Sequence, residues 1–314
     1  MKQRDSTEPI ATVVVPTRDR PRMLKRAVAS ALCQSQTDIE VVIVDDGSEH
    51  PVVTDWPDPR VRVIRREDRG GPCIARNDGM AASRGRWITF LDDDDELLPH
   101  MIEASLHAAT QSRFAPPVAV WSQKETRTSS NDVITVARPM TLAINSFAFL
   151  SDYDALHASN TLLVETDLLK SIGGWDPSVE YAEQLELFLR LNRTCPIDVV
   201  PDVTYIAYRH EGTRQSQRIV ERGDSFMRIS RKHQDVLRQH ADVHSMMMAN
   251  AVHSYLRADS WQPAITAAAR GVAINRKDPE AYGRLALSVA GPRLSRTYRS
   301  IRLYTATARR KPAR

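Results

Sequence analysis

The chain has 314 residues, of which 42% are hydrophobic and 26% charged, a composition ordinary for a soluble globular protein that buries a core. It contains no apolar run of about 18 residues and starts with a polar segment, so neither a membrane-spanning helix nor a signal peptide is expected. The three cysteines are odd in number and lack metal-ligand spacing, so we expect free thiols in a reducing cytoplasm.

Apolar runs alternate with helically spaced apolar residues through the first third of the chain. The runs predict buried strands at residues 10–15, 39–44, 61–64 and 87–91, with Pro16 ending the first. Helices are expected at residues 21–32, from 70 to about 82 and from 99 to about 109. Strands that alternate with helices predict an α/β fold with a doubly wound, mostly parallel sheet.

The rest of the chain changes character along its length. Residues 118–121 and 161–164 are expected to be strands, residues 126–132 a polar turn, and residues 181–193 a helix. After about residue 221 the pattern is all-helical, with helices expected at 246–257, 261–274 and 278–289. The last two resemble a tetratricopeptide-type hairpin, but one such pair is too little for a solenoid.

Polar clusters follow three of the predicted strands: residues 17–19, 45–48 and the four aspartates Asp92 to Asp95. Ligands of doubly wound sheets bind at the carboxyl ends of the strands, so we expect these clusters to meet at one site. Four neighbouring carboxylates repel one another unless a cation lies among them, and their hard oxygens suit Mg²⁺ or Mn²⁺ with phosphate oxygens completing the shell. The alternative is an acidic turn that caps the next helix.

Four segments together carry a family resemblance. Val13 to Arg20, Val44 to Ser48, Ala75 to Gly79 and Phe90 to Asp95 are similar, in order and spacing, to the successive motifs of family 2 glycosyltransferases of the GT-A fold. The resemblance covers roughly residues 9–215. It implies a nucleotide-sugar-binding catalytic domain at residues 1–220, followed by a helical appendage at 221–314.

The resemblance also implies roles for single residues. Asp46 matches the carboxylate that accepts a hydrogen bond from the base, and Asp92 or Asp93 matches the residue near the ribose or donor sugar. Metal ligands are expected at Asp94, with Asp92 and His210 as further candidates. Further contacts to the nucleotide, the sugar or the phosphates are implied for Pro16, Thr17, Arg18, Arg76, Asn77, Arg209 and Arg214.

The chain departs from the family pattern at the residue that takes the acceptor proton. The family usually has an aspartate there, in a Glu-Asp pair at the start of a helix, and this chain has Gln184. A glutamine amide does not accept a proton at neutral pH. Glu183 or Glu186 could act instead, or the chain binds a nucleotide sugar without transferring it. We hypothesise that Glu183 is the base.

The predicted function is therefore metal-dependent, inverting transfer of a sugar from a nucleotide-diphosphate sugar, with UDP favoured, to an acceptor hydroxyl. Surface polysaccharide, glycolipid or natural-product glycans are the expected products. A non-catalytic nucleotide-sugar-binding scaffold is the alternative. A nucleotidyltransferase is disfavoured because the loop after the first strand, residues 16–20, has no glycine.

The end of the chain is strongly basic. Residues 293–314 hold eight Lys or Arg and no Asp or Glu, within a net charge of +4. A basic amphipathic helix there could rest on anionic lipid, which predicts a cytoplasmic protein with possible peripheral membrane contact; packing on the appendage is the alternative. Nucleic acid is not an expected partner because no aromatic stacking platform accompanies the charges.

Overall fold

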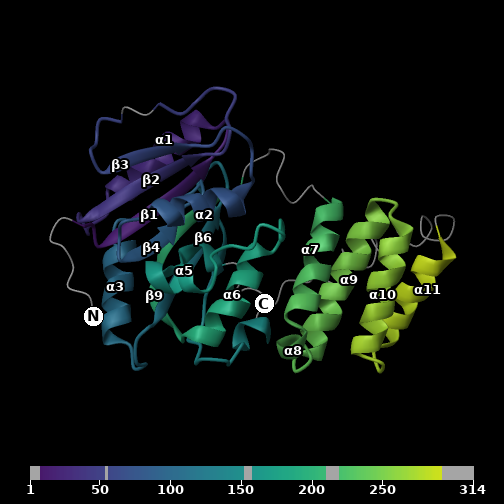
Figure 1. Ribbon diagram of the computed structural model, residues 1–314. Helices are drawn as coiled ribbons and strands as arrows, with labels where there is room; N and C mark the ends of the chain where they lie inside the picture. Colours follow the sequence, from purple (N-terminus) through teal and green to yellow (C-terminus); the bar gives the residue numbers. More distant parts are fainter. Residues whose placement is uncertain (1–7, 54–55, 152–157, 210–218, 292–314) are drawn as a thin grey trace. The chain divides into compact units, whose positions relative to one another are not determined.

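The computed structural model describes residues 8–53, 56–151, 158–209 and 219–291 (Figure 1). The chain divides into two compact units, Met1–Gly212 and Thr213–Arg314. The sequence places the boundary a few residues later, after residue 220. The first unit holds the sheet and the second is helical, which confirms the predicted α/β domain with a helical appendage.

Nine strands form one sheet in the described part of the first unit. Four neighbours are parallel, in the order β3 (Val61–Arg65), β2 (Ile39–Asp45), β1 (Ala11–Thr17) and β4 (Trp87–Phe90). The sheet continues with antiparallel β8 next to β4, followed by β6, β9 and β5. β8 pairs with the first part of β6, at Val120, and β7 pairs with its last part, residues 124–127. These later strands are β5 (Glu96–Leu97), β6 (Ala119–Arg127), β7 (Val133–Ala137), β8 (Leu163–Glu165) and β9 (Ile197–Tyr208).

Helices pack on both faces of the parallel strands, which explains why these strands are apolar along their whole length. Val13 and Val15 face one side, in a core with Leu24 and Val28 of α1 (Pro21–Leu32). Val14 faces the other side, where Gly79 of α2 lies so close that an added Cβ would meet a Val14 methyl at 2.3 Å. The other helices of this unit are α2 (Pro72–Ala82), α3 (Met101–Gln111), α5 (Thr166–Ser171) and α6 (Glu183–Thr194).

Several predicted strand ends were wrong, among them those of β1 and β6 and the start of β8, which is Leu163 and not residue 161. β1 continues through Pro16 to Thr17, where the sequence predicted that Pro16 ends the strand. Pro16 is tolerated because β4 pairs with β1 only as far as Val14, so Pro16 is flanked by β2 alone. β6 continues to Arg127, through the start of the predicted polar turn, because β9 pairs with it along its whole length. Neither β9 nor β5 was predicted.

The helical unit contains α7 (Ile219–Lys232), α8 (Gln234–Leu237), α9 (Ala241–Arg257), α10 (Trp261–Ile274) and α11 (Pro279–Ala290). α9 packs against α7 and α10, and α10 packs against α11. The close contact of α9 and α10 follows from small residues, since Ala264, Ala267 and Ala268 of α10 are buried. The predicted helix at 261–274 is confirmed, and the other two are confirmed with shifted ends.

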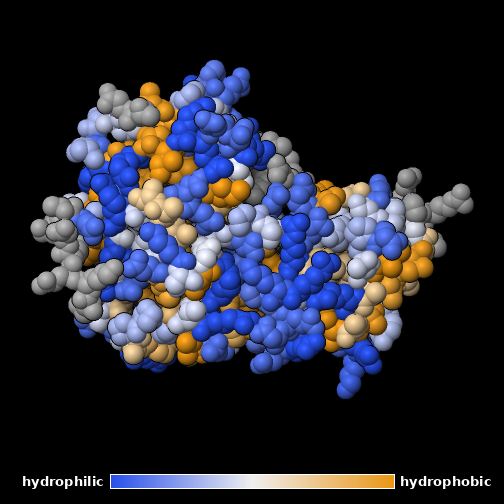
Figure 2. Space-filling view, viewed as in Figure 1, coloured by the Kyte–Doolittle hydropathy of each residue, from blue (hydrophilic) through white to orange (hydrophobic). Residues whose placement is uncertain are grey.

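The surface of the helical unit is not uniformly polar. Apolar residues gather on the visible face over α10 and α11 (Figure 2). On α11 itself, Tyr282 is 49% exposed and Val289 is 64% exposed. No helix among the described residues has the length and apolar character needed to cross a membrane. The basic segment at 293–314 lies outside the described residues.

Candidate functional site

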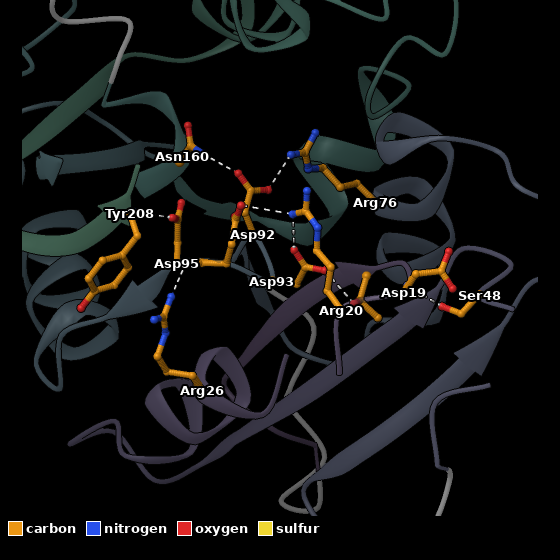
Figure 3. A network of polar contacts seen from close by, with 12 residues as sticks. Asp19, Arg20, Arg26, Ser48, Arg76, Asp92, Asp93, Asp95, Asn160 and Tyr208 are labelled. Atoms are coloured by element: carbon orange, nitrogen blue, oxygen red, sulfur yellow. Dashed lines mark hydrogen bonds and ion pairs between the residues drawn. The ribbon is translucent and has the colours of Figure 1, made fainter. Parts of the chain in front are cut away.

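The adjacent ends of β1 and β4 bring together a group of side chains that we call the strand-end cluster: Thr17, Arg20, Asp92, Asp93, Asp94 and Asp95. Because β1 and β4 are parallel neighbours, their carboxyl ends lie at the same edge of the sheet. The Thr17 hydroxyl donates to Asp93 Oδ2 at 2.7 Å, and Arg20 Nη1 donates to Asp93 Oδ1 at 3.0 Å. The predicted meeting of these two strand ends is therefore seen in the contacts (Figure 3).

The four aspartates have different partners. Asp93 binds Thr17 and Arg20, as described. Asp95 is buried, and its carboxylate accepts a hydrogen bond from the Tyr205 hydroxyl at 2.9 Å. It also accepts one from the Tyr208 backbone N–H at 3.0 Å (Figure 3). Burial, together with the charges of Asp92 and Asp94, raises the pKa of Asp95 to about 8. Asp93 and Asp95 thus each accept hydrogen bonds from two residues of the surrounding protein.

Asp92 and Asp94 are the more accessible members, with side chains 30% and 26% exposed. Across the residues described, no three His, Cys, Asp or Glu side chains converge on one position for an ion. Mg²⁺ and Mn²⁺ are commonly held by one or two carboxylates, with phosphate and water oxygens completing the shell. The oxygen donors of Asp92 and Asp94 fit that kind of site. The third predicted ligand, His210, lies outside the described residues.

Arg76 connects the strand-end cluster to the first turn of α6. Its Nη2 donates to Asp92 Oδ1 at 2.8 Å, and its Nη1 donates to Glu183 Oε1 at 3.3 Å. Its guanidinium carbon also lies 4.6 Å from the ring centroid of Trp175. Burial lowers the pKa of Arg76, but the charges of Asp92 and Glu183 more than offset this, so its pKa is raised. Arg76 is therefore a buried cation that holds two carboxylates near each other.

The three candidates for the acceptor base lie in different surroundings. The pKa of Glu183 is raised by burial, despite the opposing charge of Arg76. Glu186 is fully buried, and both of its carboxylate oxygens accept hydrogen bonds from Arg190, at 2.6–3.0 Å. Gln184 lines a small pocket with Arg76, Phe90, Asp92, Asn160, Leu162 and Trp175. Glu183 thus binds Arg76, which also binds Asp92 of the strand-end cluster, whereas Glu186 binds Arg190.

Arg190 and Asn77 hold the glycine-rich segment that carries Trp175. Arg190 donates to the carbonyl oxygens of Ile172 and Gly174, both at 2.6 Å. The Asn77 amide donates to the Trp175 carbonyl and accepts from the Trp175 N–H, both at 2.8 Å. Asn77, expected beside the nucleotide and sugar, therefore positions the Trp175 backbone. Trp175 in turn packs edge-on against Phe90, with ring centroids 5.4 Å apart.

Replacing Gly174 with alanine is expected to lower the free energy of unfolding by about 3 kcal/mol. Gly174 has φ of +62°, and an added Cβ would lie 2.5 Å from Asn77 Oδ1. Gly173 is the matched control, because its φ is +85° but an added Cβ would meet nothing within 4 Å. Gly173→Ala should therefore cost only the backbone strain, about 1–2 kcal/mol. Urea denaturation of both variants measures the difference, and equal losses would contradict the close packing at Gly174.

The residues expected on the nucleotide side lie at the ends of β1 and β2. Asp46 is buried, and its two carboxylate oxygens accept hydrogen bonds from the backbone N–H groups of Gly70 and Gly71 at 2.7 and 2.8 Å. Arg18 is 40% exposed and pairs with Asp19 at 3.3 Å. Pro16 precedes Thr17 in β1, and Arg209 is exposed after β9. Arg214 lies outside the described residues.

Arg20 and Lys124 also belong to this region, although the sequence did not assign them to the site, and so does Asn160, which lies in a segment similar to an acceptor-side landmark of the family. Arg20 was visible in the first motif but had no role. Asn160 donates to Asp92 Oδ2 at 2.9 Å. Lys124 is 8% exposed and lies opposite Tyr205 of β9. Burial lowers the pKa of Lys124, against the charges of Asp95 and Asp92. Lys124 was missed because the sequence did not extend its strand beyond residue 121.

Comparison with known proteins supports the same reading. The family profile "Glycosyl transferase family 2" matches residues 12–155. The "Succinoglycan biosynthesis protein ExoO" of Rhizobium meliloti is 41% identical over 104 residues, which are 32% of this chain and 30% of that protein. The "Putative colanic acid biosynthesis glycosyl transferase WcaA" of Escherichia coli is 34% identical over 103 residues, 31% of this chain and 37% of that protein. The matches thus span about a third of the length of these relatives.

Solved structures share the fold at lower sequence identity. S. aureus TarS superimposes with a TM-score of 0.64 at 16% identity, over 89% of this chain and 52% of that one. TarS 1–349 in complex with UDP-GlcNAc gives 0.58 at 18% identity, over 84% and 81% of the two chains. The sheet and its helices therefore have the GT-A-type architecture. Residues 12–155 thus resemble the glycosyl transferase family 2, and the curated relatives and the shared fold agree with that resemblance.

Proposed function

We propose that this chain is a glycosyltransferase that moves a sugar from a nucleoside-diphosphate sugar, UDP first among candidates, to an acceptor hydroxyl with inversion. One observation carries the proposal: the accessible Asp92 lies at the strand-end cluster, is bound by Arg76 and Asn160, and lines the same small pocket as Gln184. The printed names of the relatives, which refer to succinoglycan and colanic acid biosynthesis, support surface polysaccharide as the product. UDP-GlcNAc in the TarS structure supports a UDP-sugar donor.

The proposed donor lies along the edge formed by β2, β1 and β4. The nucleotide is assigned to the side of Thr17 and Asp46, and Arg18 and Arg209 are exposed cations suited to phosphates. Asp92 and Asp94 are the residues that would hold Mn²⁺ or Mg²⁺. When bound there, the ion acts as a Lewis acid that offsets the negative charge of the leaving diphosphate.

The transfer step needs a base, and we assign that role to Glu183. The acceptor oxygen forms a bond to the anomeric carbon while the bond from that carbon to the diphosphate oxygen breaks. The electron pair leaves with the nucleoside diphosphate, and the acceptor proton passes to the Glu183 carboxylate. Burial favours this role because it raises the pKa of Glu183, and Arg76 fixes the carboxylate beside Asp92. Gln184 can hydrogen-bond a sugar hydroxyl from the wall of the pocket.

The proposal is tested with a panel of UDP-, GDP- and dTDP-sugars and Mn²⁺, with release of nucleoside diphosphate as the readout. We expect slow hydrolysis of one donor class, lost with EDTA and restored by added Mn²⁺. The Asp94→Asn variant should lose the restored activity, because it removes a ligand charge. Hydrolysis that is equal with and without EDTA would contradict the metal dependence.

A second candidate function is a binding protein that does not transfer the sugar. The observation that favours it is Gln184 on the pocket wall, since this side chain is an amide where the family usually has a catalytic aspartate. Tight binding of a nucleotide sugar with no hydrolysis or transfer in the same panel would select this function.

A further inference from the structure

Arg20 occupies the space between two carboxylates of the strand-end cluster. It directly precedes α1, and its Nη1 donates to Asp93 Oδ1 at 3.0 Å and to Asp94 Oδ2 at 3.1 Å (Figure 3). The Arg20 side chain is 44% exposed, whereas that of Asp93 is 7% exposed. A guanidinium stays charged at every relevant pH, so Arg20 supplies a permanent positive charge where the aspartates would repel each other.

A divalent ion held by Asp94 would perform the same electrostatic task. Two cations bound to one carboxylate repel each other, so the ion and the Arg20 guanidinium cannot both bind Asp94 at full strength. The main chain at this point does not depend on Arg20, because Arg26 Nη2 donates to the Asp94 carbonyl oxygen at 2.5 Å and Arg26 Nε pairs with Glu96 at 2.9 Å. The Asp94 backbone is therefore held in place even if Arg20 moves away.

We propose that Arg20 is a built-in counter-cation that competes with the divalent ion for Asp94 and turns to the diphosphate when ion and nucleotide bind together. The second half of this inference rests on the proposed function, because it takes a nucleoside diphosphate as the ligand. The half-exposed guanidinium belongs to the segment between β1, which ends at Thr17, and α1, and a phosphate matches its donor geometry. Arg20 would thus couple ion binding to nucleotide binding.

The test measures two affinities in wild type and Arg20→Gln. Mn²⁺ binding without nucleotide is followed by electron paramagnetic resonance, and UDP binding at saturating Mn²⁺ is followed by calorimetry. Removing the competing charge should tighten Mn²⁺ binding about fivefold, while losing a phosphate contact should weaken UDP binding about tenfold. The two changes have opposite signs, whereas a merely structural defect would weaken both.

Arg22→Gln is the matched control, because Arg22 is exposed in the first turn of α1; both affinities should stay at the wild-type values. Arg20→Lys keeps the charge and should leave Mn²⁺ binding near wild type. If Arg20→Gln does not fold, Arg20→Ala replaces it in the same measurements. Mn²⁺ affinity that is unchanged or weaker in the variant overturns the competition. Failure of the proposed function shows differently, as a wild type that binds no UDP with or without Mn²⁺.

Discussion

Glu183→Gln is expected to lower kcat for sugar transfer by about a hundredfold or more, the range found when a general base is removed. The substitution keeps a side chain of similar size in the first turn of α6 but removes the group that takes the acceptor proton. It also leaves Arg76 with Asp92 as its remaining carboxylate partner. Steady-state kinetics with the donor found in the sugar-nucleotide panel measures the effect, and the acid limb of the kcat–pH profile should disappear with the carboxylate.

Two further variants make this experiment decisive. Glu103→Gln removes an exposed carboxylate from α3 that binds the Ser35 hydroxyl and no residue of the strand-end cluster in the contacts described, and should leave kcat within about twofold of wild type. Gln184→Asp places a carboxylate on the wall of the pocket. If wild type and Glu183→Gln turn over equally slowly while Gln184→Asp gains transfer, Glu183 is not the base and the chain is better described as a binding protein.

Glu186→Gln is expected to lower the free energy of unfolding of the first unit by about 3–5 kcal/mol, the cost of breaking a buried ion pair from one side. Glu186 is fully buried and binds Arg190, which is itself only 15% exposed. Without the carboxylate, the Arg190 charge would remain buried with only neutral oxygens, those of the new amide and of the Ile172 and Gly174 carbonyls, as its acceptors among the contacts described. Chemical denaturation followed by tryptophan fluorescence measures the loss, since Trp87, Trp121 and Trp175 are buried in this unit.

The helical unit offers a control with the same spacing. Glu280 and Arg284 form an i,i+4 pair on α11, at 3.2 Å, but the Glu280 side chain is 65% exposed. Glu280→Gln should cost at most about 0.5 kcal/mol, because water and salt screen exposed pairs. Equal losses for Glu186→Gln and Glu280→Gln would show that burial does not determine the strength of the Glu186–Arg190 pair.

Short-range patterns were sufficient for the parallel half of the sheet and for the long helices. β1, β2 and β4 are buried on both faces, so their apolar runs are visible in the sequence without knowledge of their neighbours. β5 and β9 were missed because they carry charged and polar residues, and their pairing depends on partners more than 70 residues away. Whether such a segment forms a strand depends more on the neighbours it packs against in the sheet than on the intrinsic preference of its residues.

The sequence by itself determined the family resemblance, the α/β class and the strands whose ends bring Thr17, Asp46 and Asp92 to one edge, because parallel neighbours place their carboxyl ends at one edge. Only the tertiary structure decided what each carboxylate does. The four consecutive aspartates differ in exposure, and one of them, Asp93, binds Arg20 from a distant part of the chain. Glu183 and Glu186 differ in partner, because Glu183 binds Arg76 and Glu186 binds Arg190 one turn further along α6. The partner and the burial of a carboxylate set its charge and its chemistry, and Asp92, Asp93 and Glu183 obtain their partners from segments that are not their neighbours in sequence.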